Sequence, residues 1–275
     1  MGTSTSSMGP GSGVSLDPPW LDEVVSNIGG GSSVPLGDDE PLLAPLELSG
    51  TAPPARYGDA RREFGKYAKN GNNQHLGNAF GHYSRRGNGG ARALAGRMRA
   101  STRAGAALFS FLNAVSQRTS PEAARWVDNL RISNPSADDV VDAIIRELAS
   151  PGGSADEESF RDSMGLALSA LVKDDPTVDP LSMRVDDIWE LMKGFLATEV
   201  ANRVCFDLGP VFESAQIDVT TAVMRERQMR LFIKNELGMH VDLLRGTNEN
   251  PTRGQLDSIL QETLTMTFEL FEAQV

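Results

Sequence analysis

The sequence predicts an all-α protein, in which a helical body follows a long disordered tail rich in glycine, proline and serine. Three observations support this fold class. Apolar residues recur every three or four positions over most of residues 56–275, which is the period of an amphipathic helix. The alternation of β-branched and polar residues that is typical of strands is almost absent. Residues that favour helix starts precede several of the apolar runs.

The chain divides into three parts on composition. We expect a disordered tail at residues 1–55, a basic helical region rich in small residues at 56–118, and an acidic helical domain at 119–275. Charge is distributed unevenly along these parts. The tail, called the leader below, has seven acidic residues and no Lys or Arg, whereas residues 56–103 have eleven basic residues and two acidic ones. This basic block lies between two acidic stretches in a chain of net charge −11.

The leader has too few apolar side chains to offset the entropy cost of ordering it. Its first thirteen residues carry no charge, and the prolines that follow prevent any long helix. Short apolar pieces interrupt it, among them Pro19-Trp20-Leu21 with Val24 and Val25. These pieces fit a docking motif for a partner's groove, and they equally fit a segment that folds back on this protein's own surface.

Three helices are expected in the basic region. The first covers residues 58–69 and ends at Gly71, a typical C-cap residue. The second covers 73–86 and ends at the glycine-rich break 87–90. The third covers 91–117, where many alanines and glycines permit close packing between helices.

Six helices are expected in the acidic domain. The first three begin with a serine at the N-cap position, followed by a proline or by an acidic residue three positions later. The last three are indicated by their apolar stripes. The expected ranges are 121–130, 140–148, 154–172, 186–206, 219–237 and 255–271.

The residue patterns do not indicate a catalytic site. The sequence has no Walker loop, no zinc-type Cys/His spacing and no G-x-S-x-G motif. His75, His82 and His240 have no second-ligand pattern, so we interpret them as surface or helix-packing residues. Cys205 lies in an apolar helical pattern and is interpreted as a core residue in a reducing compartment. We therefore expect a cytoplasmic protein that is not an enzyme, has no metal site and does not span a membrane.

The basic block is a candidate binding surface. Its cations could contact nucleic-acid phosphates, the acidic half of this chain, or an acidic partner. The arginines singled out for nucleic-acid or partner binding are Arg61, Arg62, Arg85, Arg86, Arg92 and Arg97.

Gly2 is the candidate for modification. Glycine is small enough for Met1 to be removed, which leaves an unhindered α-amino group with a pKa of about 7.7–8.0. Part of this amine is an unprotonated nucleophile at neutral pH, whereas lysine, with a pKa of about 10.4, is not. The leader is thus either a substrate for modification or a plain disordered segment. Gly2 and Ser6 also fit the N-myristoylation pattern, but no polybasic segment follows directly, so we expect no membrane attachment.

Several short stretches carry a family resemblance. They are MGTSTSS (1–7), GPGSGV (9–14), PPW (18–20), YGDARR (57–62), YSRRGNGG (83–90) and Arg97-Met98. Together they resemble the QatB family, the associated protein of the bacterial Qat anti-phage system. Met8 departs from the Gly or Ser expected in that part of the leader, but it leaves Gly2 unchanged.

The resemblance implies a non-enzymatic component of a four-member defence operon. The other members are an ATPase, a QueC-like ligase (QatC-like) and a TatD-like nuclease. It further implies that the ligase attaches a 7-deazaguanine group to Gly2, so that the chain is a substrate and adaptor with no cofactor besides this covalent group. The residues that would enter the ligase active site are Thr3, Ser4, Thr5 and Ser6.

Overall fold

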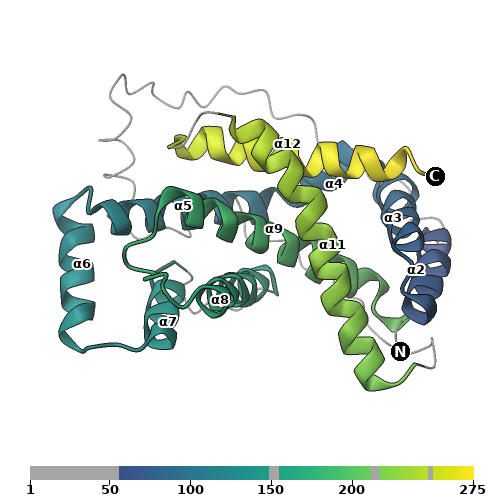
Figure 1. Ribbon diagram of the computed structural model, residues 1–275. Coiled ribbons are helices and arrows are strands. Elements are labelled where there is room, and N and C mark those ends of the chain that lie inside the picture. The colour runs from purple at the N-terminus through teal and green to yellow at the C-terminus, as the bar shows by residue number, and fades with distance from the viewer. Residues whose placement is uncertain (1–55, 149–154, 212–216, 247–249) are drawn as a thin grey trace.

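The structure is a computed structural model that describes residues 56–148, 155–211, 217–246 and 250–275 (Figure 1). Within these ranges the regular structure consists of helices, with no strand, and the predicted all-α class is confirmed. The leader lies outside the described residues. None of the described helices is both long and apolar enough to cross a membrane.

Every expected helix is present. The elements are α2 (Gly58–Asn70), α3 (Asn73–His82), the π-helical turn η1 (Tyr83–Gly87), α4 (Ala91–Arg97), α5 (Arg99–Gln117), α6 (Pro121–Ile132), α7 (Ala137–Leu148), α8 (Ala155–Asp174), α9 (Val185–Leu208), α11 (Val219–Arg245) and α12 (Arg253–Glu272).

Most expected bounds agree with the structure within three residues, but three helices differ more. The helix expected at 73–86 ends as an α-helix at His82 and is followed by the π turn η1. The helix expected at 91–117 is broken at Met98, whose backbone (φ −95°, ψ 15°) leaves the helical region. The Met98 N–H still reaches two carbonyls of α4, so α5 follows with only a local interruption. The helix expected at 219–237 continues to Arg245, because the buried stripe of α11 extends through Gly238 to Val241. Gly238 has a low helix propensity, but it does not end the helix, because packing outweighs local propensity here.

Local signals determined several helix ends as expected. The side chain of Ser120 accepts a hydrogen bond from the Ala123 N–H at 3.1 Å at the start of α6. Before α7, Ser136 and Asp139 form a reciprocal capping box at 3.2 and 2.9 Å. Gly71 ends α2 in the left-handed conformation at φ 70°.

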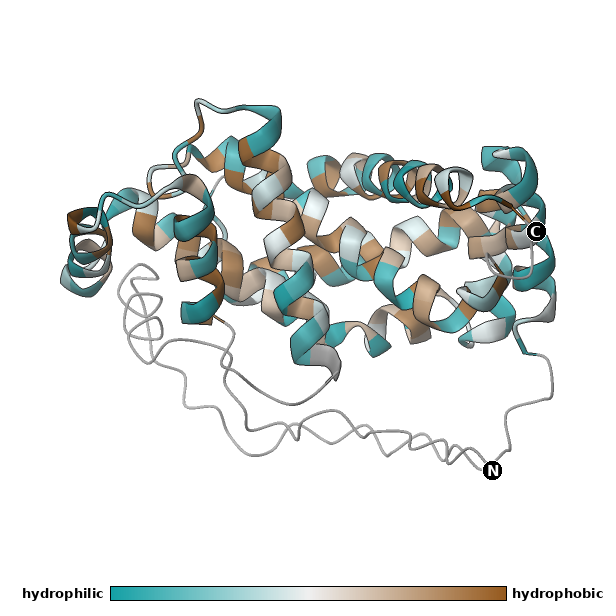
Figure 2. Ribbon diagram, turned by 90° about the horizontal axis from the view of Figure 1, so that it is seen from below, coloured by the Kyte–Doolittle hydropathy of each residue, from teal (hydrophilic) through white to brown (hydrophobic). Residues whose placement is uncertain are grey.

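A single apolar cluster extends from Tyr57 to Phe271 and joins the described helices. Helix α9 packs against α5, α8 and α11, while α12 packs against α3, α4, α5 and α11. Between α5 and α9, the rings of Phe109 and Trp189 meet edge-on with centroids 5.0 Å apart. Between α3 and α12, the ring centroids of Phe80 and Phe271 are 5.2 Å apart. Apolar and polar residues accordingly alternate around most of the ribbons in Figure 2.

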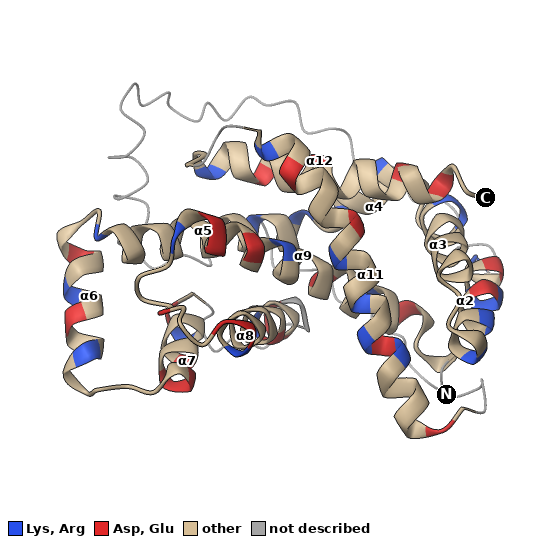
Figure 3. Ribbon diagram, in the orientation of Figure 1, with Lys and Arg blue, Asp and Glu red and all other residues tan. Residues whose placement is uncertain are grey.

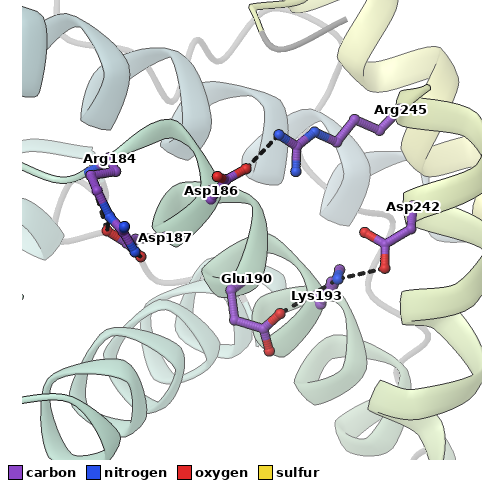
Figure 4. Close-up of polar contacts among 7 residues, drawn as sticks. All are labelled: Arg184, Asp186, Asp187, Glu190, Lys193, Asp242 and Arg245. Atoms are coloured by element: carbon purple, nitrogen blue, oxygen red, sulfur yellow. Dashed lines mark hydrogen bonds and ion pairs between the residues drawn. The ribbon is translucent and has the colours of Figure 1, made fainter. Parts of the chain in front are cut away.

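Ion pairs also hold α11 against α9 (Figure 4). Arg245 contacts Asp186 at 2.6 Å, and Lys193 contacts Asp242 at 2.8 Å. An acidic residue at the start of a helix can cap it, and the first turn of α9 contains two aspartates. Asp187 has that role, because it accepts from the Arg184 N–H at 3.2 Å, but Asp186 faces α11 instead.

Candidate functional site

Residues 83–90, called the family motif below, form the π-helical turn η1 and the turn that follows it. A π turn inside a helical run is rare and often marks a functional position. Gly89 and Gly90 then turn the chain toward α4 at φ values of 83° and 99°, which favour glycine. A side chain at Gly87 would collide with the ring of Tyr57, so this motif requires glycine there for close packing.

Asn88 supports the turn from within. It is buried, its side-chain amide donates to the Tyr83 carbonyl at 3.0 Å, and its amide oxygen accepts from Arg97 at 2.8 Å. The motif is therefore connected to the end of α4 by side chains as well as by the backbone.

A tyrosine–aspartate cluster joins this motif to α2 and α9. The rings of Tyr57 and Tyr83 stack with centroids 5.5 Å apart. Both hydroxyls donate to the same carboxylate oxygen of Asp207, at 3.3 Å from Tyr57 and 2.6 Å from Tyr83. Arg203 lies 3.9 Å from that oxygen and partly balances its charge. The residue Asp207 carried no signal in the sequence, because the two tyrosines that it accepts from are more than a hundred positions away.

The environment of the cluster keeps both phenols neutral. Burial raises the pKa of Tyr83 far above its usual range, and the Asp207 carboxylate raises it further. Burial and Asp207 likewise raise the pKa of Tyr57. The cluster thus suits hydrogen-bond donation by the tyrosines and not proton transfer at neutral pH.

The C-terminus of the chain closes the other side of the motif. Ser84, which is fully buried, donates to Glu272 at 2.6 Å. The guanidinium of Arg85 donates to the carbonyl of Val275 at 2.8 Å. A side chain at Gly81 would collide with the Phe271 carbonyl, so α3 and α12 approach each other closely at this point.

Five of the six arginines singled out from the sequence contact other parts of the chain while remaining exposed. Their charges and hydrogen bonds are therefore partly engaged in holding the body together. The partners are the Asp207 carbonyl for Arg61, Asp59 for Arg62 and Arg86, the Val275 carbonyl for Arg85, and Asn88 for Arg97.

Arg92 differs from these five. Together with Arg99 and Arg103 of the same basic block, it is exposed, and the guanidinium groups of these three residues make no hydrogen bond or ion pair with any described residue. Arg99 and Arg103 were not singled out from the sequence, although their spacing of four on α5 places them on one helix face. Along the described helices, basic and acidic residues are interspersed (Figure 3).

Glu199 is a second feature that the sequence did not reveal. This buried carboxylate of α9 accepts hydrogen bonds from Ser101 at 2.7 Å, Ser163 at 2.6 Å and Ser159 at 3.1 Å. It thereby connects α5, α8 and α9 at one point. Three hydroxyl donors stabilise a charge that would otherwise be costly to bury.

The histidines and the cysteine have structural surroundings. His75 contacts the buried Glu63 at 2.8 Å, and His240 contacts Thr267 at 2.8 Å. Burial lowers the pKa of His82 and raises that of Cys205 to about 11. In the part of the chain that is described, no group of three or more His, Cys, Asp and Glu side chains could hold a metal ion.

An open groove of about 510 Å³ lies beside the start of α9. Its charged side chains already engage one another or a neighbouring helix: Arg184 pairs with Asp187 at 2.9 Å, and Asp179 pairs with Arg131 at 2.7 Å. The groove therefore presents few unengaged charges to a ligand.

The modification residues Gly2, Thr3, Ser4, Thr5 and Ser6 lie outside the described residues.

Comparison with known proteins gives information on the helical body of the chain. A family model described as "Qat anti-phage system associated protein QatB" matches residues 89–271, which is well over half of the chain and includes most of the described helices. Searches of curated proteins and of solved structures found no match. The chain therefore belongs to the QatB family, and it is a component of the Qat anti-phage defence system with other Qat components as its partners.

Proposed function

We propose that this chain is the protein substrate and adaptor of the Qat system, and that a QueC-like ligase conjugates a 7-deazaguanine group to Gly2 after removal of Met1. The observation that carries the proposal is the QatB family match over residues 89–271. In the reaction, the ligase activates a deazaguanine carboxylate with ATP. The Gly2 nitrogen attacks the activated carbon, the C–N bond of an amide forms, the bond to the AMP group breaks, and the nitrogen loses a proton.

The composition of the leader supports this chemistry. An α-amino group with a pKa of about 7.7–8.0 is partly unprotonated at neutral pH, so it can replace ammonia as the nucleophile. Thr3, Ser4, Thr5 and Ser6 are small enough to enter a narrow active site and can make backbone hydrogen bonds there.

The described body supports an adaptor role without catalysis of its own. Burial raises the pKa of the Cys205 thiol to about 11, which reduces its reactivity as a nucleophile. In this proposal the chain acts in the cytoplasm, and it connects the ligase with the Qat ATPase and the TatD-like nuclease.

Intact-protein and peptide mass measurement tests the modification. The chain is produced together with the QueC-like ligase, and the expected result is a mass increase that maps to the N-terminal peptide starting at Gly2. Gly2→Val, which still permits removal of Met1, should lower the yield of modified protein at least tenfold because the amine is hindered. Lys173→Ala, at an exposed position of α8, serves as the control and should be fully modified. An unmodified Gly2 beside a demonstrably active ligase would refute the proposal.

A second candidate function, binding of nucleic acid, is favoured by one observation. Arg92, Arg99 and Arg103 are exposed and unpaired within the described part of the chain. Reversing these three charges should weaken DNA or RNA binding at least tenfold at low salt and reduce the slope of log K against log salt by about 2–3. Lys173→Glu, at an exposed and equally unpaired cation of α8, is the matched control. Absence of binding by the unmodified sequence at low salt would exclude this function.

A further inference from the structure

An exposed apolar ridge runs along α11, which crosses the front of the molecule over α9 in Figure 1. Every fourth residue from position 219 to position 243 is exposed, and residues at this spacing form one ridge on a helix. The exposed fractions reach 79% at Val219, 59% at Leu231 and 66% at Leu243, so these side chains are hardly covered by the body. The apolar members of this α11 ridge are Val219, Val223, Leu231, Met239 and Leu243.

A cation interrupts the ridge. Arg227 lies one helical turn from Val223 and one from Leu231. Its guanidinium makes no hydrogen bond or ion pair with any described residue. Its neighbours on the helix are engaged, since Arg225 contacts Gln228 and Arg230 contacts Glu226. A segment that complements the ridge should therefore present apolar side chains next to a carboxylate.

Residues 17–28 of the leader have this pattern. Asp17 followed by Pro18-Pro19 is a typical helix start. The apolar residues that follow at helical spacing would share one face, and Asp22 and Glu23 would flank that face on its two sides. The apolar residues are Trp20, Leu21, Val24, Val25 and Ile28.

The chain between residues 17–28 and the described body is long enough to let this segment reach α11. The described body begins at Arg56, directly before α2, and the far end of α2 touches α11: the Tyr67 hydroxyl donates to the Arg225 carbonyl at 2.7 Å. A helix of the length of α2 spans about 20 Å. The 27 residues between Ile28 and Arg56 have a root-mean-square span of about 30 Å as a flexible chain.

We propose that residues 17–28 dock on the α11 ridge of the same chain, with their apolar face on Val223 and Leu231 and with an acidic side chain facing Arg227. The first sixteen residues would then project from the body as an arm with a root-mean-square reach of about 22 Å. Docking would thus determine from which side of the body Gly2 is presented. The inference does not rest on Gly2 being modified.

Site-specific photo-crosslinking in the full-length chain tests this docking. The photo-reactive residue p-benzoylphenylalanine replaces Leu231 in one protein and, as a matched control, replaces Ile132 in another, since Ile132 on α6 is 81% exposed. The expected result is an intrachain crosslink from position 231 to the peptide that holds residues 17–28, at a yield independent of protein concentration. Position 132 should give no such product.

Two variants identify the contacts. Trp20→Ala combined with Leu21→Ser, and separately Arg227→Glu, should each lower the yield of that crosslink at least fivefold, with an unchanged helical circular dichroism signal. Crosslinks between two chains would assign the ridge to a second copy and overturn the proposal. Crosslinks from position 231 to other segments, or an undiminished yield in the Trp20 and Leu21 double variant, would overturn it as well. None of these readouts depends on the mass of the N-terminal peptide.

Discussion

The hydroxyl of Tyr83 donates to a carboxylate oxygen of Asp207 at 2.6 Å, although the two residues are 124 positions apart. This bond ties the π turn of the family motif to the last turns of α9. Tyr57, at the start of the described body, reaches the same oxygen at 3.3 Å. The point where the leader joins the body and the family motif are therefore held by one acidic side chain.

Removing this bond should destabilise the fold. We expect Tyr83→Phe to lower the free energy of unfolding by about 2 kcal/mol, because hydrogen bonds to charged groups contribute about 1.5–3 kcal/mol. Tyr57→Phe is the matched control and should cost less than about 1 kcal/mol, since its bond to Asp207 is longer. Urea denaturation measures both. Equal losses in the two variants would contradict the assigned roles.

The tyrosines should resist ionisation while the protein is folded. The chain has three tyrosines. Burial raises the pKa of each, in Tyr67 to about 12. A raised folded-state pKa contributes stability that is fully present below the unfolded value of about 10 and is lost as pH rises above it.

Phenolate absorbance as a function of pH checks this expectation. The native protein should show little phenolate at pH about 10, followed by a cooperative increase when it unfolds at higher pH, whereas the chain in urea should titrate near pH about 10. A gradual native titration centred near that value would show that the phenols are accessible.

Glu199 should be needed for stability. In Glu199→Ala the buried hydroxyls of Ser101 and Ser163 lose their acceptor, and we expect a loss of about 3 kcal/mol, because unsatisfied buried polar groups cost about 1–3 kcal/mol each. Glu262→Ala, at an exposed position of α12, should change stability by less than about 0.5 kcal/mol. Thermal unfolding of both variants measures the two changes in stability. A loss of stability in Glu199→Ala as small as that in Glu262→Ala would contradict the role of Glu199 as a buried acceptor.

Two glycines should respond in opposite directions to alanine. At Gly81 the added methyl group would collide with the backbone carbonyl of Phe271, so Gly81→Ala should separate α3 from α12 and cost about 2 kcal/mol or more. At Gly96 in α4 nothing lies within 4 Å of the added carbon, so Gly96→Ala should stabilise by about 0.4–1 kcal/mol. Denaturation midpoints of the two variants measure both effects. An unchanged midpoint in Gly81→Ala would argue against the close packing of α3 on α12.

Much of the fold could be predicted because helices are determined by contacts within a few residues. The period of the apolar residues located every described helix, and the capping box of Ser136 and Asp139 formed as expected. The π turn at 83–87, the break at Met98 and the extension of α11 to Arg245 were missed. The extension depends on the packing of the buried stripe of α11, which reaches Val241. The family resemblance was also readable from short motifs, and the family match over the body confirmed it.

The sequence by itself determined the all-α class, the order of the helices and the family, because these follow from local periodicity, capping residues and short motifs. Only the tertiary structure decided that Asp207 accepts from two tyrosines, that Glu199 accepts from three serines, and that the Arg92 side chain has no polar partner among the described residues while Arg97 contacts Asn88. The tyrosines and serines that donate to Asp207 and Glu199 lie between 36 and 150 positions from them in the chain, and a local pattern carries no information about which distant side chain a helix will face.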